Sequence, residues 1–198
     1  MQRLVIATTN AGKIREIEQI LAGTPFEIVT LAQFPQVPAP EETGQTFAEN
    51  ARQKALYYAR ATGELTVAED SGLEIQALEG RPGVESARFG GDTSYPEKFA
   101  LIYAALAEKP GASRAARFVC ALALAQGERI VFESTGTVEG RIAPEPRGTG
   151  GFGYDPIFFY PPFGATLAEA ADQKSEVSHR ARAFRRLRRF LLTAAPLR

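Results

Sequence analysis

Apolar positions near the N-terminus predict a strand, a helix and a second strand. Residues 4–7 are apolar without interruption, which is typical of a strand buried on both faces. Isoleucine and leucine then recur at helical spacing over 14–21, and a further apolar run covers 26–31. We therefore expect a β-α-β unit whose two strands pair in parallel.

The middle of the chain combines an amphipathic helix with an apolar run that two acidic residues interrupt. Apolar residues at helical spacing predict a helix over 46–61. Residues 65–68 resemble a buried strand that stops at Glu69 and Asp70, and an alternating pattern resumes over 73–78. We expect a strand, a turn and a second strand in this stretch.

The second half of the chain predicts a helix, a hairpin and a last helix. A helix capped by a serine is expected over 94–108, and two strand-like runs over 117–126 and 128–139 suggest a hairpin. The last helix opens at Lys174 and carries an apolar stripe beside many arginines. This order of strands and helices indicates an α/β fold.

Composition narrows the class of protein. The chain has 198 residues, 44% of them hydrophobic, with 23 basic and 23 acidic side chains, which suits a single domain over 1–198 with no overall charge for nucleic acid or membrane. Cys120 and His179 are the only residues of their types, which excludes a disulfide framework and a Cys/His zinc cluster. No signal peptide or spanning segment is recognisable, so we expect a cytoplasmic protein.

The adjacent carboxylates Glu69 and Asp70 are the first candidate for chemistry. Carboxylates at the end of a core strand are costly to desolvate unless a cation meets them. Mg²⁺ suits such a place, because it takes oxygen ligands and needs only one or two protein carboxylates. An ordinary acidic turn explains the same residues, and this stretch alone leaves both interpretations open.

The turn before the first predicted helix is a candidate anion site. Asn10 is a plausible N-cap, and the free amide groups of a helix start attract anions. Lys13 opposes the helix dipole in the first turn, which makes sense if a polyanion such as a triphosphate binds there. The turn lacks the spacing of a Walker A loop.

A glycine-rich segment and a group of cations suggest a place for the rest of a nucleotide. Residues 148–153 contain four glycines around Phe152, an arrangement that suits stacking on a nucleobase, although a flexible loop with a buried Phe152 is the alternative. Lys174, His179 and Arg180 follow at the expected start of the last helix, where positive charge is unfavourable without an anion or an acceptor.

Together these motifs resemble the inosine triphosphate pyrophosphatases, a family of dITP/XTP pyrophosphatases that hydrolyse non-standard purine nucleoside triphosphates. The matching blocks occur in the order of the family and span nearly the whole chain. They are Thr8-x-Asn10-x-x-Lys13, Glu41-Glu42-Thr43-Gly44, Phe47-x-Glu49-Asn50-Ala51-x-x-Lys54-Ala55, Glu69-Asp70-Ser71-Gly72-Leu73, Gly83-Val84-x-Ser86-Ala87-Arg88, Gly148 through Phe158, and Lys174-x-x-x-Ser178-His179-Arg180.

The resemblance implies a fold, a cofactor and a set of site residues. It implies a long mixed sheet flanked by helices, two lobes with a nucleotide cleft between them, a homodimer, and Mg²⁺-dependent release of pyrophosphate. Asp70 would be metal ligand and proton acceptor, Glu41 a second metal ligand, and Glu69 a possible one. The residues that would bind substrate are Thr8, Thr9, Asn10, Ala11, Gly12, Lys13, Ser71, Phe152, Gly153, Tyr154, Asp155, Lys174, His179 and Arg180.

The donor residues near the expected base suggest a preference for ITP, dITP and XTP over ATP. Hypoxanthine and xanthine present a 6-keto acceptor where adenine presents an amino donor, and unpaired buried donors are costly. Rejection of GTP follows from the resemblance alone. Two rivals are a Maf-like pyrophosphatase of modified pyrimidine or guanine triphosphates and an RNA-binding protein that uses the arginine-rich last helix.

Overall fold

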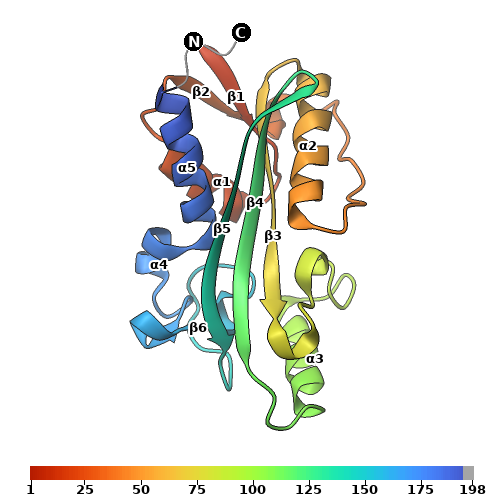
Figure 1. Cartoon of the computed structure of the whole chain (residues 1–198), viewed down its shortest axis with the longest axis vertical. Coiled ribbons are helices and arrows are strands. Elements are labelled where there is room, and N and C mark those ends of the chain that lie inside the picture. The colour runs from red at the N-terminus through yellow and green to blue at the C-terminus, as the bar shows by residue number, and fades with distance from the viewer. Residues whose placement is uncertain (194–198) are drawn as a thin grey trace. The chain divides into compact units, whose positions relative to one another are not determined.

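A seven-stranded mixed sheet with the strand order β2-β1-β3-β4-β5-β6-β7 organises the part of the chain that is described, residues 1–193 of a computed structural model (Figure 1). The strands are β1 (Gln2–Ile6), β2 (Phe26–Thr30), β3 (Leu65–Ile75), β4 (Ala115–Gln126), β5 (Arg129–Ile142), β6 (Phe158–Tyr160) and β7 (Ala165–Thr166). The helices are α1 (Ala11–Leu21), α2 (Phe47–Thr62), α3 (Tyr95–Ala107), α4 (Ala171–Val177) and α5 (His179–Thr193). The predicted α/β class is confirmed.

The chain divides into two compact units, each assembled from separate segments. Unit 1 comprises residues 1–70, 120–136 and the segment from His179 onward, and unit 2 comprises 71–119 and 137–178. Strands β3, β4 and β5 contribute residues to both units. Neither unit is therefore a continuous piece of sequence, and the single domain expected over 1–198 stays a prediction.

Unit 1 contains the predicted β-α-β start. Strand β1 pairs in parallel with β2, where Leu4 lies opposite Ile28, and in parallel with β3, where Leu4 lies opposite Leu65. Helix α5, blue in Figure 1, packs beside α1, and the fully buried Ile17 and Leu187 belong to the same apolar cluster. Burying each such side chain stabilises the fold by about 1.5–3 kcal/mol. This packing holds α1 and α5 in place, and both helices carry polar site residues at their N-terminal ends.

Local signals in the sequence set the helix ends in unit 1. The Asn10 side chain accepts a hydrogen bond from the Lys13 amide at 3.1 Å, as expected for an N-cap of α1. Thr46 and Glu49 form a capping box at the start of α2, and Gly63 ends that helix in the left-handed region with φ of 73°. These caps position the α1 turn and the face of α2 that carries Asn50 and Lys54.

The predicted turn between two strands at Glu69 and Asp70 is wrong. Strand β3 is 11 residues long and continues through both acidic residues. Glu69 is only 3% exposed and Asp70 only 6% exposed. Cations from other elements meet them, Lys13 at Glu69 and Lys54 at Asp70, so the chain does not have to turn toward water to solvate the charges. The carboxylates lie in the middle of a core strand.

The single last helix predicted from Lys174 is also wrong. Ser178, with extended backbone at φ −61° and ψ 152°, separates α4 from α5. Lys174 lies in the last turn of α4, where a cation suits the helix dipole, and only His179 and Arg180 open the following helix. The three cations therefore do not share one helix start.

Unit 2 has its own core and the antiparallel part of the sheet. Strand β6 pairs antiparallel with β5 and with β7, and the predicted hairpin of β4 and β5 is confirmed by their adjacency in the sheet across Gly127 and Glu128. Fully buried Leu73, Ile102 and Phe158 belong to its apolar cluster. No helix in the described part of the chain is both long and apolar enough to cross a membrane.

Candidate functional site

Asp70 is held by two side chains from α2. Its Oδ2 accepts a hydrogen bond from Asn50 Nδ2 at 2.8 Å, and its Oδ1 lies 3.8 Å from Lys54 Nζ. Burial raises the pKa of the Asp70 carboxyl above its usual value, and Lys54 and the Asn50 hydrogen bond oppose that rise only in part. Asp70 is thus a positioned carboxylate whose burial favours the proton-accepting role that the sequence predicted for it.

Glu42, rather than Glu41, is the second carboxylate of this group. Lys54 Nζ donates to Glu42 Oε1 at 2.7 Å, so Glu42 and Asp70 share one ammonium group. Glu41 is exposed, and the structure of residues 1–193 gives its side chain no hydrogen bond or ion pair. The role of Glu41 as a metal ligand stays a prediction. In the sequence, Lys54 on the following helix α2 was the feature that could have indicated a partner for Glu42.

These oxygen donors fit a magnesium ion. Mg²⁺ is bound through one or two carboxylates and keeps several waters, and Asp70 with a neighbouring glutamate supplies that set. Within residues 1–193 no group of three or more His, Cys, Asp or Glu side chains is arranged to hold a metal. A cation beside Asp70 would favour the ionised carboxylate against the effect of burial.

Asn50 joins the Asp70 strand to the loop that carries the glutamates. Its Nδ2 donates to Asp70, and its Oδ1 accepts from the Gly44 amide at 2.8 Å. A Cβ on Gly44 would come within 2.6 Å of that same Oδ1, so a glycine is needed for the close approach. The sequence analysis did not assign this role to Asn50.

Replacing Asn50 by alanine is expected to lower the free energy of unfolding by about 1–3 kcal/mol, because the buried Asp70 carboxylate and the Gly44 amide lose their partner. Urea unfolding followed by circular dichroism measures the change. Gln53→Ala, an exposed position on the same helix, is the control and should fall within about 0.5 kcal/mol of the wild type. Equal stability of both variants would contradict the anchoring role.

Glu69 lies at the centre of a second group in unit 1, in which its partners include two cationic side chains. Its carboxylate lies 2.7 Å from Lys13 Nζ and 3.3 Å from Arg180 Nη2, and it accepts a hydrogen bond from Cys120 Sγ at 3.3 Å. Burial opposes ionisation of Glu69, but Lys13 and Arg180 outweigh it and hold the pKa of the carboxyl well below its usual range. Glu69 is therefore ionised.

Arg180 is tied to two carboxylates rather than left to solvent. Its Nη1 donates to Glu16 Oε2 at 2.7 Å in addition to the Glu69 contact, and the residue is 1% exposed. The nearby carboxylates raise its pKa further above the usual value, although burial acts against this. Lys13 and Arg180, both predicted to bind substrate, thus both contact Oε1 of Glu69 in this structure.

The turn before α1 keeps the features expected of an anion site. Thr9, Asn10 and Ala11 are exposed, and the first turn of α1 contains no acidic residue. The Thr8 hydroxyl accepts a hydrogen bond from the Asn10 amide at 3.2 Å, which fixes the turn. Exposed amides at a helix start with a lysine beside them suit phosphate oxygens.

Phe152, Asp155 and Lys174 form a compact group in unit 2. Asp155 Oδ2 accepts from the Phe152 amide at 2.8 Å and from Lys174 Nζ at 2.7 Å. The Lys174 ammonium also lies over the Phe152 ring, 4.3 Å from its centroid. Phe152 is half-buried in this group, so the flexible loop with a fully buried Phe152 is not observed.

The glycine segment and its neighbours give this group a fixed frame. Gly151 adopts φ of 69°, and a Cβ there would meet Asp155 Oδ2 at 2.2 Å, so only glycine allows the close approach. Tyr154 Oη donates to the Ser86 carbonyl at 2.8 Å, and burial raises the pKa of that phenol. The Tyr95 ring meets the Tyr154 ring edge-on, with centroids 5.2 Å apart.

The predicted site residues fall into both units. Unit 1 holds Thr8, Thr9, Asn10, Ala11, Gly12, Lys13, Glu41, Glu69, Asp70, His179 and Arg180, and unit 2 holds Ser71, Phe152, Gly153, Tyr154, Asp155 and Lys174. His179 is buried at the first position of α5, and Ser71 is half-buried in β3. The structure adds Asn50, Lys54 and Glu42 to the Asp70 group and Glu16 to the Arg180 group.

Comparison with known proteins identifies the family of this chain. The dITP/XTP pyrophosphatase of Geobacter sulfurreducens is 48% identical, covering 92% of this chain and 93% of that protein. The dITP/XTP pyrophosphatase of Listeria monocytogenes is 46% identical, covering 97% and 96%. A HAM1 protein structure from Coxiella burnetii matches with TM-score 0.92 and 39% identity, covering 98% of this chain and 100% of that one. The Ham1 family model matches residues 4–190, and this chain belongs to the Ham1 family.

Proposed function

We propose that this protein is a nucleoside-triphosphate pyrophosphatase that converts ITP, dITP and XTP into the monophosphate and pyrophosphate. The observation that carries the proposal is the buried pair Glu69 and Asp70, met by Lys13 on one side and Lys54 on the other. The curated relatives are named dITP/XTP pyrophosphatases, which supports this substrate class. Such an enzyme removes deaminated purines from the nucleotide pool.

Mg²⁺ is the proposed cofactor. Asp70 would hold it together with Glu41 or Glu42, which lie next to each other in the loop that Asn50 ties to Asp70 through Gly44. Glu69 is the less suitable ligand, because its oxygens face Lys13 and Arg180. The bound ion would neutralise charge on the phosphate oxygens.

The protein side chains supply positioning and proton transfer. Phosphoryl oxygens repel an attacking water, so catalysis depends on charge neutralisation and alignment. Asp70 takes the proton from that water, and the raised pKa of its carboxyl suits a proton acceptor. The exposed amides at the start of α1 and the Lys13 ammonium, which Glu69 fixes at 2.7 Å, bind the triphosphate.

The group in unit 2 is proposed to bind the nucleoside. The Phe152 ring, framed by glycines, stacks on the base, and Lys174, oriented by Asp155, donates to an acceptor. A 6-keto purine offers that acceptor, whereas the amino group of adenine does not. The proposed contacts of Ser71, His179 and Arg180 with the nucleoside rest on the resemblance to the family.

Steady-state kinetics over a panel of triphosphates tests the function. We expect kcat/KM for ITP, dITP and XTP to exceed that for ATP by at least about a hundredfold, because a site of donors rejects the wrong base strongly. GTP and modified pyrimidine triphosphates belong in the panel as a test for the Maf-like alternative. Removal of Mg²⁺ with a chelator should abolish pyrophosphate release, and equal rates on ATP and ITP would refute the specificity.

Assembly and location complete the proposal. We expect a homodimer, which sedimentation velocity would detect as twice the mass of one 21.5 kDa chain. We also expect a cytoplasmic enzyme of one domain that binds neither nucleic acid nor membrane. RNA affinity without Mg²⁺-dependent pyrophosphate release would instead favour the arginine-rich α5 as an RNA-binding surface.

A further inference from the structure

A cavity of about 750 Å³ in unit 2 shares no residue with the site described above. Its volume lies within the range of about 300–1,000 Å³ that is usual for small-molecule pockets. The charged residues among those that line it are Arg114, Arg141 and Arg147, and no acidic residue lines it. Three arginines and no acidic residue in the lining make the surroundings of this cavity positively charged.

Strands β5 and β6 hold Arg141 in place. Arg141 lies directly opposite Phe159 in the antiparallel register, and its guanidinium carbon lies 4.5 Å from the centroid of the Phe159 ring. Gly140 lines the same cavity, and a Cβ there would come within 2.5 Å of the Phe159 carbonyl oxygen. The wall formed by these residues is therefore tightly packed.

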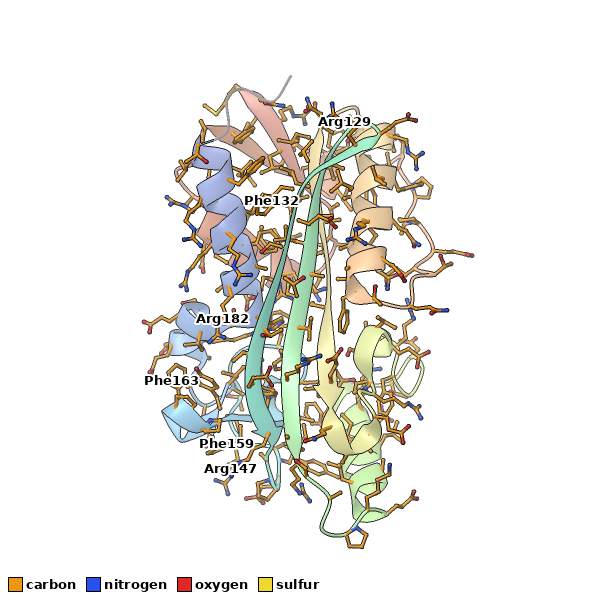
Figure 2. The ribbon with its side chains drawn as sticks, viewed as in Figure 1. Arg129, Phe132, Arg147, Phe159, Phe163 and Arg182 are labelled. Atoms are coloured by element: carbon orange, nitrogen blue, oxygen red, sulfur yellow. The ribbon has the colours of Figure 1, made fainter. Side chains whose placement is uncertain are left out.

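Arg147 is fixed by its backbone, while its side chain faces the solvent. Its amide donates to the Pro156 carbonyl at 2.9 Å, and its carbonyl accepts from Thr166 Oγ1 at 2.8 Å. Its guanidinium pairs with Glu145 at 3.2 Å, but both side chains are more than half exposed, so that pair contributes little. Figure 2 shows Arg147 and Phe159 close together at the end of β5 and β6.

Arg114 completes the set from the segment before β4. Its carbonyl accepts a hydrogen bond from the Ile142 amide at 2.8 Å, which ties this segment to the end of β5 that carries Arg141. The backbone thus fixes the attachment points of all three arginines. Guanidinium groups bind phosphate oxygens through paired hydrogen bonds.

We propose that this cavity is a second anion site that binds inorganic phosphate or pyrophosphate. Arg141 covers one face of the Phe159 ring, and the charged residues of the lining are all arginines, so we assign the recognition to the phosphate rather than to a base. Because no carboxylate lines the cavity, binding does not need a metal ion. In both respects it differs from the site proposed around Asp70.

Isothermal titration of the full-length protein with sodium pyrophosphate, in metal-free buffer with a chelator, tests the site. We expect Arg141→Gln/Arg147→Gln to bind pyrophosphate at least about tenfold more weakly than the wild type. Arg129→Gln/Arg182→Gln removes the same charge from exposed positions of unit 1, labelled in Figure 2, and should leave binding within twofold. Arg114→Gln serves as an independent variant at the third arginine.

Further measurements separate the possible ligands and sites. Orthophosphate should compete with pyrophosphate, and inosine monophosphate should bind no more tightly than a simple phosphate monoester. The Lys13→Gln variant should still bind pyrophosphate in metal-free buffer. The Arg141→Gln/Arg147→Gln variant should hydrolyse ITP at the initial rate of the wild type. The proposal is overturned if Arg141→Gln/Arg147→Gln binds pyrophosphate as tightly as the wild type, or if Arg129→Gln/Arg182→Gln loses as much affinity. It is also overturned if inosine monophosphate binds tenfold more tightly than a simple phosphate monoester.

Discussion

Replacing Asp70 by asparagine is expected to lower kcat for ITP hydrolysis by about 10²–10⁴-fold, the usual contribution of a general base. The substitution keeps the size of the side chain but removes the proton acceptor and the charge that would face a metal ion. Pyrophosphate release at saturating ITP and Mg²⁺ measures the effect. Asp92→Asn, at an exposed position of unit 2, is the matched control and should keep the wild-type rate.

The same variant should not be less stable than the wild type. Burial raises the pKa of Asp70, which means that the fold disfavours the ionised form, and an amide carries no charge to desolvate. A melting temperature at or above that of the wild type, together with lost turnover, separates a chemical role from a structural one. Turnover near the wild-type value would show that another group accepts the proton.

Replacing Arg180 by methionine is expected to cost about 3–5 kcal/mol of unfolding free energy at pH 7, because it leaves the buried Glu69 carboxylate and the half-buried Glu16 carboxylate short of a partner. Glu69, with its side chain 1% exposed, would keep Lys13 and the weak Cys120 thiol donor, and Glu16 would lose its contact at 2.7 Å. Urea unfolding gives the change. Arg182→Met, exposed on the same helix, should fall within about 0.5 kcal/mol of the wild type.

The double variant Glu69→Gln/Arg180→Met tests the cause. If the unpaired carboxylate causes the loss, removing its charge should recover most of the stability, whereas a simple packing defect would remain. The pH dependence has a definite sign. The folded pKa of Glu69 is lowered, so its stabilisation is complete above the unfolded value of about 4.3 and is lost as the pH falls through the folded pKa. An Arg180→Met deficit that persists undiminished in acid would contradict this explanation.

Local patterns predicted much of the fold. The N-cap at Asn10, the helix that begins after Thr46 and the hairpin around Gly127 depend on neighbouring residues and were confirmed. The failures at Glu69 and Ser178 have another origin. An acidic pair looks like a turn until its cationic partners from α1 and α2 are known, and a helical apolar stripe continues across one extended serine.

For the candidate site, too, the sequence identified individual residues but not the contacts between them. Motif blocks pointed to Asp70, Lys13 and Phe152, since each lies in a short segment of unusual composition. The contacts that hold them join distant parts of the chain: Arg180 and Glu69 are 111 positions apart, and Asn50 and Asp70 are 20 positions apart. No spacing rule could have shown that Asn50 connects Gly44 to Asp70.

The continuous strand β3 places the adjacent residues Glu69 and Asp70 on opposite faces, where they have different partners. Successive side chains of a strand point to opposite faces, and the partners of Glu69 come from α1, β4 and α5, whereas those of Asp70 come from α2. One face thus carries the charge that Lys13 and Arg180 pair, and the other carries the proposed proton acceptor Asp70. A slip of one residue in the pairing of β3 would exchange them, so the strand register sets stability and catalytic competence together.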